Sequence, residues 1–349
     1  MNEPRDPLVS VCLPTYNYAQ FLPRAVESVL AQSFTDFELL VYDDASTDDT
    51  IAVMQPYLED PRVKFVVQEE NQGLFANFNQ SAAGARGKYI KYLCADDFLD
   101  PDFLTTTVPM LDDPAVEIAT CANWLIDADD QLTGEQVAPF GARGRVEAVD
   151  AAKALAEWHN VVGMPTNTLV RRDTLLSVGG FDARFAPAAD IHLWLKLLAH
   201  GDLAWSPARL CFIRIHSTHS HSYGPDPTES PFLVWSEAQA IPNSPATPEI
   251  VDRALQCESQ RVYLYVAAHL LQLRFRRAQK LLELPRGYVS QPGSFLRWLA
   301  TWPKIALAQG RRIFALRSRR MVIYDPLPRI GEPLAAATSE LPLKTPQRH

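Results

Sequence analysis

Short apolar runs alternate with amphipathic segments along the first third of the chain. Runs rich in β-branched and aromatic residues predict strands at residues 8–13, 37–42, 63–67 and 88–93. Between these runs, residues 20–31, 48–57 and 71–85 carry apolar side chains at helical spacing. This alternation predicts an α/β fold with a parallel sheet, right-handed crossovers and helices on both faces.

The pattern becomes less regular further along the chain. A fifth strand is expected at residues 116–126, short strands at 168–170 and 209–215, and helices at 151–158 and 190–200. Six prolines in residues 224–248 predict an extended linker. Thr247, Pro248 and Glu249 then form a helix start, and the helical pattern continues to about residue 284. We therefore expect one large α/β domain at residues 1–223, of a size typical of a catalytic domain. The linker at 224–248, a helical region at 249–324 and a disordered tail at 325–349 are expected to follow it.

Composition narrows the class of protein. Apolar residues make up 47% of the 349 residues, which is enough for a sizeable core. The formal charge of −8 argues against nucleic acid as a partner, because neutralising phosphates requires a basic face. Five cysteines without CxxC spacing indicate buried, reduced thiols. With no apolar stretch of 18 residues and no secretory signal, the sequence predicts a cytoplasmic protein.

Two acidic pairs follow two of the predicted parallel strands. Asp43 and Asp44 follow the second strand, and Asp96 and Asp97 follow the fourth. Ligands of such sheets bind beyond the carboxyl ends of the strands, where these four carboxylates would repel one another. A divalent cation with a phosphorylated ligand would compensate this repulsion, and Mg²⁺ or Mn²⁺ suits such a site. Either pair alone is common at turns and helix starts, so the argument depends on both.

The motifs around these residues resemble the family 2 glycosyltransferases, which have the GT-A fold. The resemblance runs through VSVCLPTYNY, LLVYDDASTDDT, YLCADDFLDPD, ADIHLWLKL and RIHSTHSHS, which cover about residues 8–222. It implies a Rossmann-like, mostly parallel sheet flanked by helices, here with an α-helical C-terminal extension. It also implies a nucleotide-diphosphate sugar as donor.

The resemblance assigns roles to single residues. It implies that Asp43 accepts the N–H of a uracil-type base and that Asp44 supports the neighbouring loop. The other residues implied to lie around the nucleotide are Pro14, Thr15, Tyr16, Asn71, Gly73, Asn77 and Asp96. Asp97 is the expected ligand of Mn²⁺ or Mg²⁺, with Asp96 nearer the ribose. His216 occupies a position that completes the metal or diphosphate site in some relatives, although a lone histidine at a strand end is more often structural.

The chain departs from the family pattern at two positions. The family often has an acid where this chain has Cys94, which leaves two acids in the metal motif. The resemblance places the catalytic base at Asp190, which the family often precedes with Glu but this chain with Ala189. We thus expect Asp190 to lack a supporting charge next to it. We expect the positive end of the helix dipole to keep its carboxylate ionised. The alternative is that Asp190 only caps that helix.

The implied reaction is an inverting transfer of a sugar to a hydroxyl acceptor. The acceptor would be a glycan or lipid-linked sugar of a surface polysaccharide such as capsule or O-antigen. The Q-x-x-R-W motif of processive relatives is absent, so one or a few sugars should be added. Two alternatives stay open: a nucleotidyltransferase, which should have a Gly-rich basic loop after the first strand, and a non-catalytic nucleotide-sugar-binding scaffold.

A basic region near the C-terminus adds one more hypothesis. Residues 284–324 contain eight Lys or Arg and no acid, together with Trp298 and Trp302. This composition is typical of an interfacial segment, so peripheral contact with an anionic membrane is expected. The alternative is that its aromatic residues pack on the catalytic domain.

Overall fold

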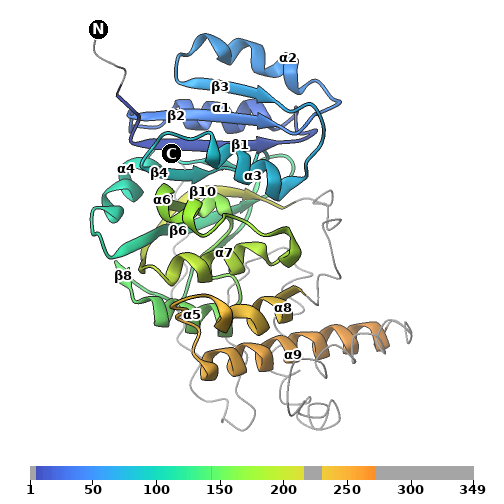
Figure 1. The fold of residues 1–349 in the computed structure, drawn as a ribbon. Helices are drawn as coiled ribbons and strands as arrows, with labels where there is room; N and C mark the ends of the chain where they lie inside the picture. The colour runs from blue at the N-terminus through green and yellow to red at the C-terminus, as the bar shows by residue number, and fades with distance from the viewer. Residues whose placement is uncertain (1–4, 143, 216–229, 272–349) are drawn as a thin grey trace, which may run out of the picture.

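The structure is a computed structural model that describes residues 5–142, 144–215 and 230–271. His216 and residues 284–324, on which two of the expectations above depend, lie outside these ranges. Figure 1 shows β3 and α2 at one end of the described residues and α8 and α9 at the other.

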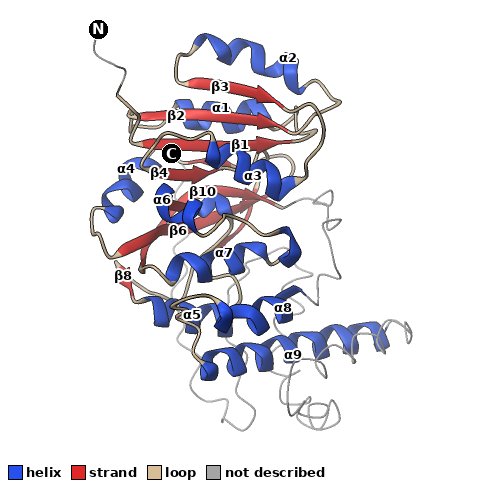
Figure 2. Cartoon of the chain, viewed as in Figure 1, coloured by secondary structure: helices blue, strands red, loops and turns tan. Residues whose placement is uncertain are grey.

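Within these described ranges, ten strands form one mixed sheet (Figure 2). They are β1 (Val9–Thr15), β2 (Phe37–Asp43), β3 (Val63–Val67), β4 (Tyr89–Tyr92), β5 (Phe98–Leu99), β6 (Val116–Ile126), β7 (Leu132–Gln136), β8 (Arg145–Val146), β9 (Thr168–Arg171) and β10 (Asp202–Arg214). The main order is β3-β2-β1-β4-β9-β6-β10-β5, with β7 beside β6 and β8 beside β10. Strands β1 to β4 pair in parallel, as do β6 and β10, whereas β9 lies antiparallel between β4 and β6.

Helices cover both faces of the sheet. They are α1 (Leu22–Leu30), α2 (Thr50–Met54), α3 (Leu74–Ala83), α4 (Phe103–Thr107), α5 (Ala148–Trp158), α6 (Arg172–Ser177), α7 (Ala189–Leu198), α8 (Ser230–Glu237) and α9 (Pro248–Leu271). Short 3₁₀ helices are η1 (Gln55–Glu59), η2 (Val108–Leu111), η3 (Pro165–Asn167), η4 (Ala183–Phe185) and η5 (Ala238–Ala240).

Each face of the sheet has its own apolar core, because successive side chains of a strand point to opposite faces. Val9, Val11 and Leu13 of β1 pack with α1 and α4, while Cys12 of the same strand packs with the opposite cluster. That second cluster includes residues of α3, α5, α7, α8 and α9. The mostly parallel sheet flanked by helices that the sequence predicts is thus observed.

Two stretches differ in detail from the sequence expectations. Pro56 has no backbone N–H to donate, and the second helix passes at Gln55 from α-helix into the 3₁₀ helix η1. Helix α8 lies inside residues 224–248, for which an extended linker was expected. Its Phe232, Val234 and Trp235 are fully buried, so the stabilisation gained from burial outweighs the effect of the surrounding prolines. Helix α9 begins at Pro248, where the capping pattern predicted a helix start.

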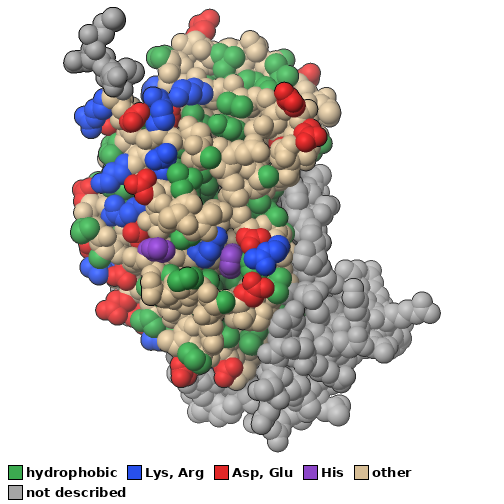
Figure 3. Space-filling view, viewed as in Figure 1, with side chains coloured by type: hydrophobic (Ala, Val, Ile, Leu, Met, Phe, Trp, Pro, Cys, Tyr) green, Lys and Arg blue, Asp and Glu red, His purple; other side chains and the backbone are tan. Residues whose placement is uncertain are grey.

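Charge is distributed unevenly on the visible face of the described residues. Figure 3 shows Lys and Arg side chains along the edge where β1, β2 and β4 begin. There the buried carboxylate of Glu38 accepts hydrogen bonds from Arg86 and Lys64. Burial alone would raise the pKa of Glu38, but hydrogen bonds from Arg86, Ser10 and Lys64 outweigh burial and lower the pKa.

Among the helices of the described residues, none is both long and apolar enough to cross a membrane.

Candidate active site

The carboxyl ends of β1 and β2 meet at one edge of the sheet. Thr15 is the register partner of Asp43, and the backbone N–H of Asp44 donates to the Thr15 carbonyl at 2.9 Å. On the other side of β1, Cys12 is the partner of Tyr92 at the end of β4. The parallel register therefore brings both acidic pairs to the same edge, as expected for a ligand site.

Asp43 and Asp44 have different environments. The buried Asp43 carboxylate accepts hydrogen bonds from the backbone N–H of Ser46, at 3.1 Å, and from its hydroxyl. Burial raises the pKa of Asp43 despite these bonds, and the nearby charges of Asp48 and Asp44 act in the same direction. A carboxylate placed this way gains from a ligand that donates hydrogen bonds to it.

Asp44 holds the loop that follows β3. Its carboxylate accepts hydrogen bonds from the backbone N–H groups of Gln72, at 2.7 Å, and Gly73, at 2.9 Å. Asn71 donates its side-chain amide to the Asp44 carbonyl at 3.3 Å. Gly73 has φ +87°, a conformation that favours glycine, and precedes the first residue of α3. Asp44 thus joins residues 71–73 to the end of β2.

Two buried polar atoms at this edge have no partner among the described residues. They are Oγ1 of Thr15 and Oδ1 of Asn77, whose amide group donates to the Tyr42 carbonyl at 2.8 Å. Unpaired buried polar atoms are uncommon because each costs the free energy of a lost hydrogen bond. Tyr16, next along the chain, is 40% exposed. These features suit a polar ligand bound across Thr15 and Asn77.

The second acidic pair lies in a buried loop. Ligand atoms of Cys94, Asp96 and Asp97 lie within 4.8 Å of one another. The Asp97 carboxylate accepts hydrogen bonds from the Thr166 hydroxyl, at 2.6 Å, and from the backbone N–H of Arg214, at 2.8 Å. Burial and the charge of Asp96 raise the pKa of Asp97 well above its usual range.

The donor set of this loop fits a hard divalent cation. Two carboxylates that repel each other in a buried place gain from a positive charge, and Mn²⁺ and Mg²⁺ prefer oxygen ligands. Cys94 adds a soft ligand that these ions do not require. Burial and the two neighbouring carboxylates also raise the pKa of the Cys94 thiol, which disfavours its metal-binding thiolate form.

Asp190 is the second residue of α7. Its carboxylate accepts hydrogen bonds from the backbone N–H of Ile191, at 2.7 Å, and from the side-chain amide of Asn160, at 2.6 Å. Burial raises the pKa of Asp190 to about 7, although backbone hydrogen bonds oppose the shift. Desolvation thus opposes the stabilisation that the helix start was expected to give the ionised carboxylate. Asn160, which the sequence did not single out, supplies an uncharged partner.

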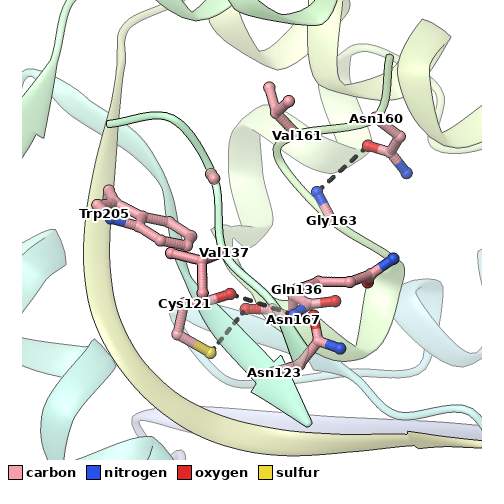
Figure 4. Close-up of a pocket in the computed structure, with 10 residues that line it drawn as sticks. Cys121, Asn123, Gln136, Val137, Asn160, Val161, Gly163, Asn167 and Trp205 are labelled. Carbon is pink, nitrogen blue, oxygen red and sulfur yellow. Dashed lines mark hydrogen bonds between the residues drawn. The ribbon is translucent and has the colours of Figure 1, made fainter. Parts of the chain in front are cut away.

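A small recess of about 10 Å³, partly open to solvent, adjoins Asp190 through Asn160 (Figure 4). Side-chain amides line much of it, from Asn123, Gln136, Asn160 and Asn167, with Trp205 and Val137 as apolar neighbours. Its volume is about that needed by one water molecule, so the recess does not by itself define a sugar-binding site.

Three residues at the site were missed from the sequence. Thr166 and Arg214 contact Asp97, and Asn160 contacts Asp190, across separations of 69, 117 and 30 residues. No local pattern distinguishes Thr166 or Asn160 from an ordinary loop residue. Arg214 stands in the RIH motif already quoted, so its position offered a weak signal.

Comparison with known proteins places these features in a family. The family described as Glycosyl transferase family 2 matches residues 10–176. The "Uncharacterized protein MT1568" of Mycobacterium tuberculosis is 30% identical over 225 residues, which are 61% of this chain and 69% of that protein. The chondroitin synthase of Escherichia coli is 46% identical over 99 residues, 28% of this chain but only 14% of the synthase. The chain thus corresponds to a small part of the synthase.

Solved structures show the same fold at low identity. Staphylococcus aureus TarS 1–349 in complex with UDP-GlcNAc has a TM-score of 0.59 at 16% identity, covering 80% of this chain and 92% of TarS 1–349. The mannosyltransferase PcManGT of Pyrobaculum calidifontis, in complex with GDP-Man and Mn²⁺, has a TM-score of 0.57 at 19% identity, covering 90% and 85%. The family match thus shows that residues 10–176 belong to glycosyl transferase family 2, whereas the solved structures, at 16% and 19% identity, show the fold alone.

Proposed function

We propose that this chain transfers a sugar from a nucleotide-diphosphate sugar, a UDP-sugar in particular, to a hydroxyl group of an acceptor, with inversion at the anomeric carbon. One observation carries the proposal: the two buried acidic pairs follow β2 and β4, the strands on either side of β1, at one edge of the sheet, beside polar atoms that have no partner among the described residues. Family membership and the UDP-GlcNAc complex of TarS support it.

The donor nucleotide would occupy the edge formed by β1, β2 and the loop before α3. Asp43 would accept the imide N–H of uracil, while Pro14, Thr15 and Tyr16 line the base and ribose. Asp44 keeps its hydrogen bonds to Gln72 and Gly73 and so holds Asn71 and the start of α3 in place. Asn77 Oδ1 is left to accept a hydrogen bond from the ligand.

Asp96 and Asp97 would hold Mn²⁺ or Mg²⁺, with Asp96 also near the ribose and His216 as a further ligand. When bound, the ion stabilises negative charge on the diphosphate. Asp97 already shares its oxygens with Thr166 and Arg214, so its position is fixed before any ligand arrives. The Mn²⁺ in the PcManGT complex supports this choice of ion.

Asp190 would act as the general base. It would accept the proton of the acceptor hydroxyl as the hydroxyl oxygen attacks the anomeric carbon, on the face opposite the departing nucleotide diphosphate. A single displacement of this kind inverts the anomeric configuration. A pKa of about 7 suits the role, because the carboxylate is substantially ionised at neutral pH yet basic enough to take the proton.

The acceptor would be a sugar of a surface glycan, such as capsule or O-antigen, carried on a growing chain or a lipid at the cytoplasmic face of a membrane. The chondroitin synthase relative supports a glycan acceptor, and the basic residues 284–324 would hold the enzyme at an anionic membrane.

The test is product analysis with a panel of UDP- and GDP-sugars in Mn²⁺, using simple glycosides as acceptors. Release of nucleoside diphosphate that increases with acceptor, and a product of inverted anomeric configuration, would support the proposal. Release of pyrophosphate would instead indicate a nucleotidyltransferase. Donor binding without any turnover would favour a binding scaffold.

A further inference from the structure

Residues 160–167, between α5 and β9, form a segment that contacts both proposed catalytic regions. At its start, the amide nitrogen of Asn160 lies 2.6 Å from Oδ2 of Asp190. Near its end, the Thr166 hydroxyl lies 2.6 Å from Oδ2 of Asp97. One short stretch of chain is therefore hydrogen-bonded to the proposed base and to the proposed metal loop.

The hydrogen bonds of Asn160 fix the orientation of its amide. Its Oδ1 accepts from the backbone N–H of Gly163 at 3.2 Å (Figure 4), which leaves the amide nitrogen facing Asp190. An amide flip would break both bonds and place an oxygen against the carboxylate. Asn160 can therefore only donate to Asp190 in this arrangement.

Thr166 is fixed just as closely. Its hydroxyl accepts from the backbone N–H of Cys94 at 3.2 Å, so its proton is directed to Asp97. Its carbonyl accepts from the buried ammonium of Lys91 and from the Cys211 thiol, the latter at 3.1 Å. Lys91 also lies over the Phe103 ring, 4.0 Å from its centroid. Thr166, Lys91 and Cys211 are fully buried, and unpaired polar atoms are costly in such a place.

The middle of the segment is braced as well. Gly163 has φ +106°, and a Cβ there would lie 2.8 Å from the Asn167 side chain. The Gly163 carbonyl accepts from the Trp194 indole of α7 at 3.1 Å, and Asn167 Oδ1 accepts from the Met164 N–H at 3.0 Å. These contacts fix the position of Asn160 relative to Thr166.

We infer that Asn160 and Thr166 are positioning residues, through which residues 160–167 set the place of the base relative to the metal loop. This inference rests on the proposed function. It assigns Asn160 to the chemical step, because the carboxylate that Asn160 contacts is that of the proposed base. It assigns Thr166 to metal-dependent donor binding, because Thr166 orients Asp97.

The experiment compares Asn160→Ala, Thr166→Val and Thr166→Ser in the full chain. Donor affinity is measured by calorimetry with Mn²⁺, and Mn²⁺ affinity by electron paramagnetic resonance. Asn160→Ala should lower kcat about 10- to 100-fold with donor affinity unchanged, the size expected for a misplaced catalytic group. Thr166→Val should weaken Mn²⁺ and donor binding about 10- to 100-fold, because it removes a group that orients a metal ligand. Thr166→Ser keeps a hydroxyl and should bind Mn²⁺ and donor as the wild type does.

Thr168→Val and Gln55→Ala are the matched controls. The buried Thr168 hydroxyl donates to the Pro165 carbonyl and to neither carboxylate, so Thr168→Val should weaken Mn²⁺ binding less than Thr166→Val does, whereas Gln55 is an exposed amide on η1 and Gln55→Ala should behave as wild type. The inference is overturned if Asn160→Ala and Thr166→Val have the same effects on kcat and on Mn²⁺ affinity. It is also overturned if Thr168→Val weakens Mn²⁺ binding as much as Thr166→Val does. If Asp190→Asn and Asp96→Asn themselves keep full turnover, the proposed function fails first and this inference with it.

Discussion

The backbone N–H of Arg214 donates a 2.8 Å hydrogen bond to the carboxylate of Asp97, across 117 residues of sequence. The Arg214 guanidinium, only 2% exposed, reaches further around the same loop. It donates to the carbonyls of Asp96, at 2.9 Å, and Asp127, at 2.6 Å, and pairs with Asp130. The end of β10 therefore holds the acidic loop after β4 in place.

Replacing Arg214 should destabilise the protein. Arg214→Met keeps the backbone bond to Asp97 but removes the buried guanidinium that donates to the Asp96 and Asp127 carbonyls and pairs with Asp130, which should cost about 2–4 kcal/mol of unfolding free energy. Urea unfolding measures this. The control is Arg209→Met, whose partly exposed pair with Glu135 should contribute less than about 1 kcal/mol. Equal effects of the two variants would contradict the special role of Arg214.

Asp97 should be required for metal-dependent donor binding. In Asp97→Ala, Mn²⁺ should no longer improve the affinity for the donor, because the carboxylate proposed to hold the ion is absent. Calorimetry with UDP-sugar, with and without Mn²⁺, measures the effect. Circular dichroism checks that the variant is folded, and Asp129→Ala, in an exposed turn, is the control. An unchanged gain from Mn²⁺ in the folded variant would contradict the assignment.

Asp190 should control turnover and its pH dependence. Asp190→Asn keeps the shape of the side chain but removes its basicity, so turnover should fall roughly 10²–10⁴-fold while donor affinity is kept. In the wild type, kcat should rise with pH through about 7 and then level off, as the carboxylate becomes ionised. Turnover within a few-fold of wild type in Asp190→Asn would mean that Asp190 only caps α7.

The same residue should make stability depend on pH. Because the folded-state pKa of Asp190, about 7, lies above its unfolded value, the protonated form favours folding. Its contribution is complete below about pH 4 and is lost as pH rises through about 7, by at most about 1.4 kcal/mol per pH unit. The difference in unfolding free energy between Asp190→Asn and wild type should therefore move in favour of the variant from pH 5 to pH 8. A difference independent of pH would contradict the raised pKa.

Much of the fold could be predicted from the sequence because the deciding pattern is local. The apolar runs at β1, β2, β3 and β6 and the helical spacing of α1 and α7 are complete within a few residues. The parallel order of the first four strands follows from their connections, and it places Asp43 and Asp97 at one edge. The placement of β9 between β4 and β6 carries no such local signal.

The sequence by itself thus determined the α/β class, the family and the acidic strand ends, since strand periodicity and motif spacing need no knowledge of distant neighbours. Only the tertiary structure decided the hydrogen-bond partners and the pKa shifts of the carboxylates. Asn160, Thr166 and Arg214 reach Asp190 and Asp97 from far along the chain, and the raised pKa of both acids comes from burial. Hydrogen-bond partners and desolvation depend on how separate segments pack, which no short stretch of sequence contains.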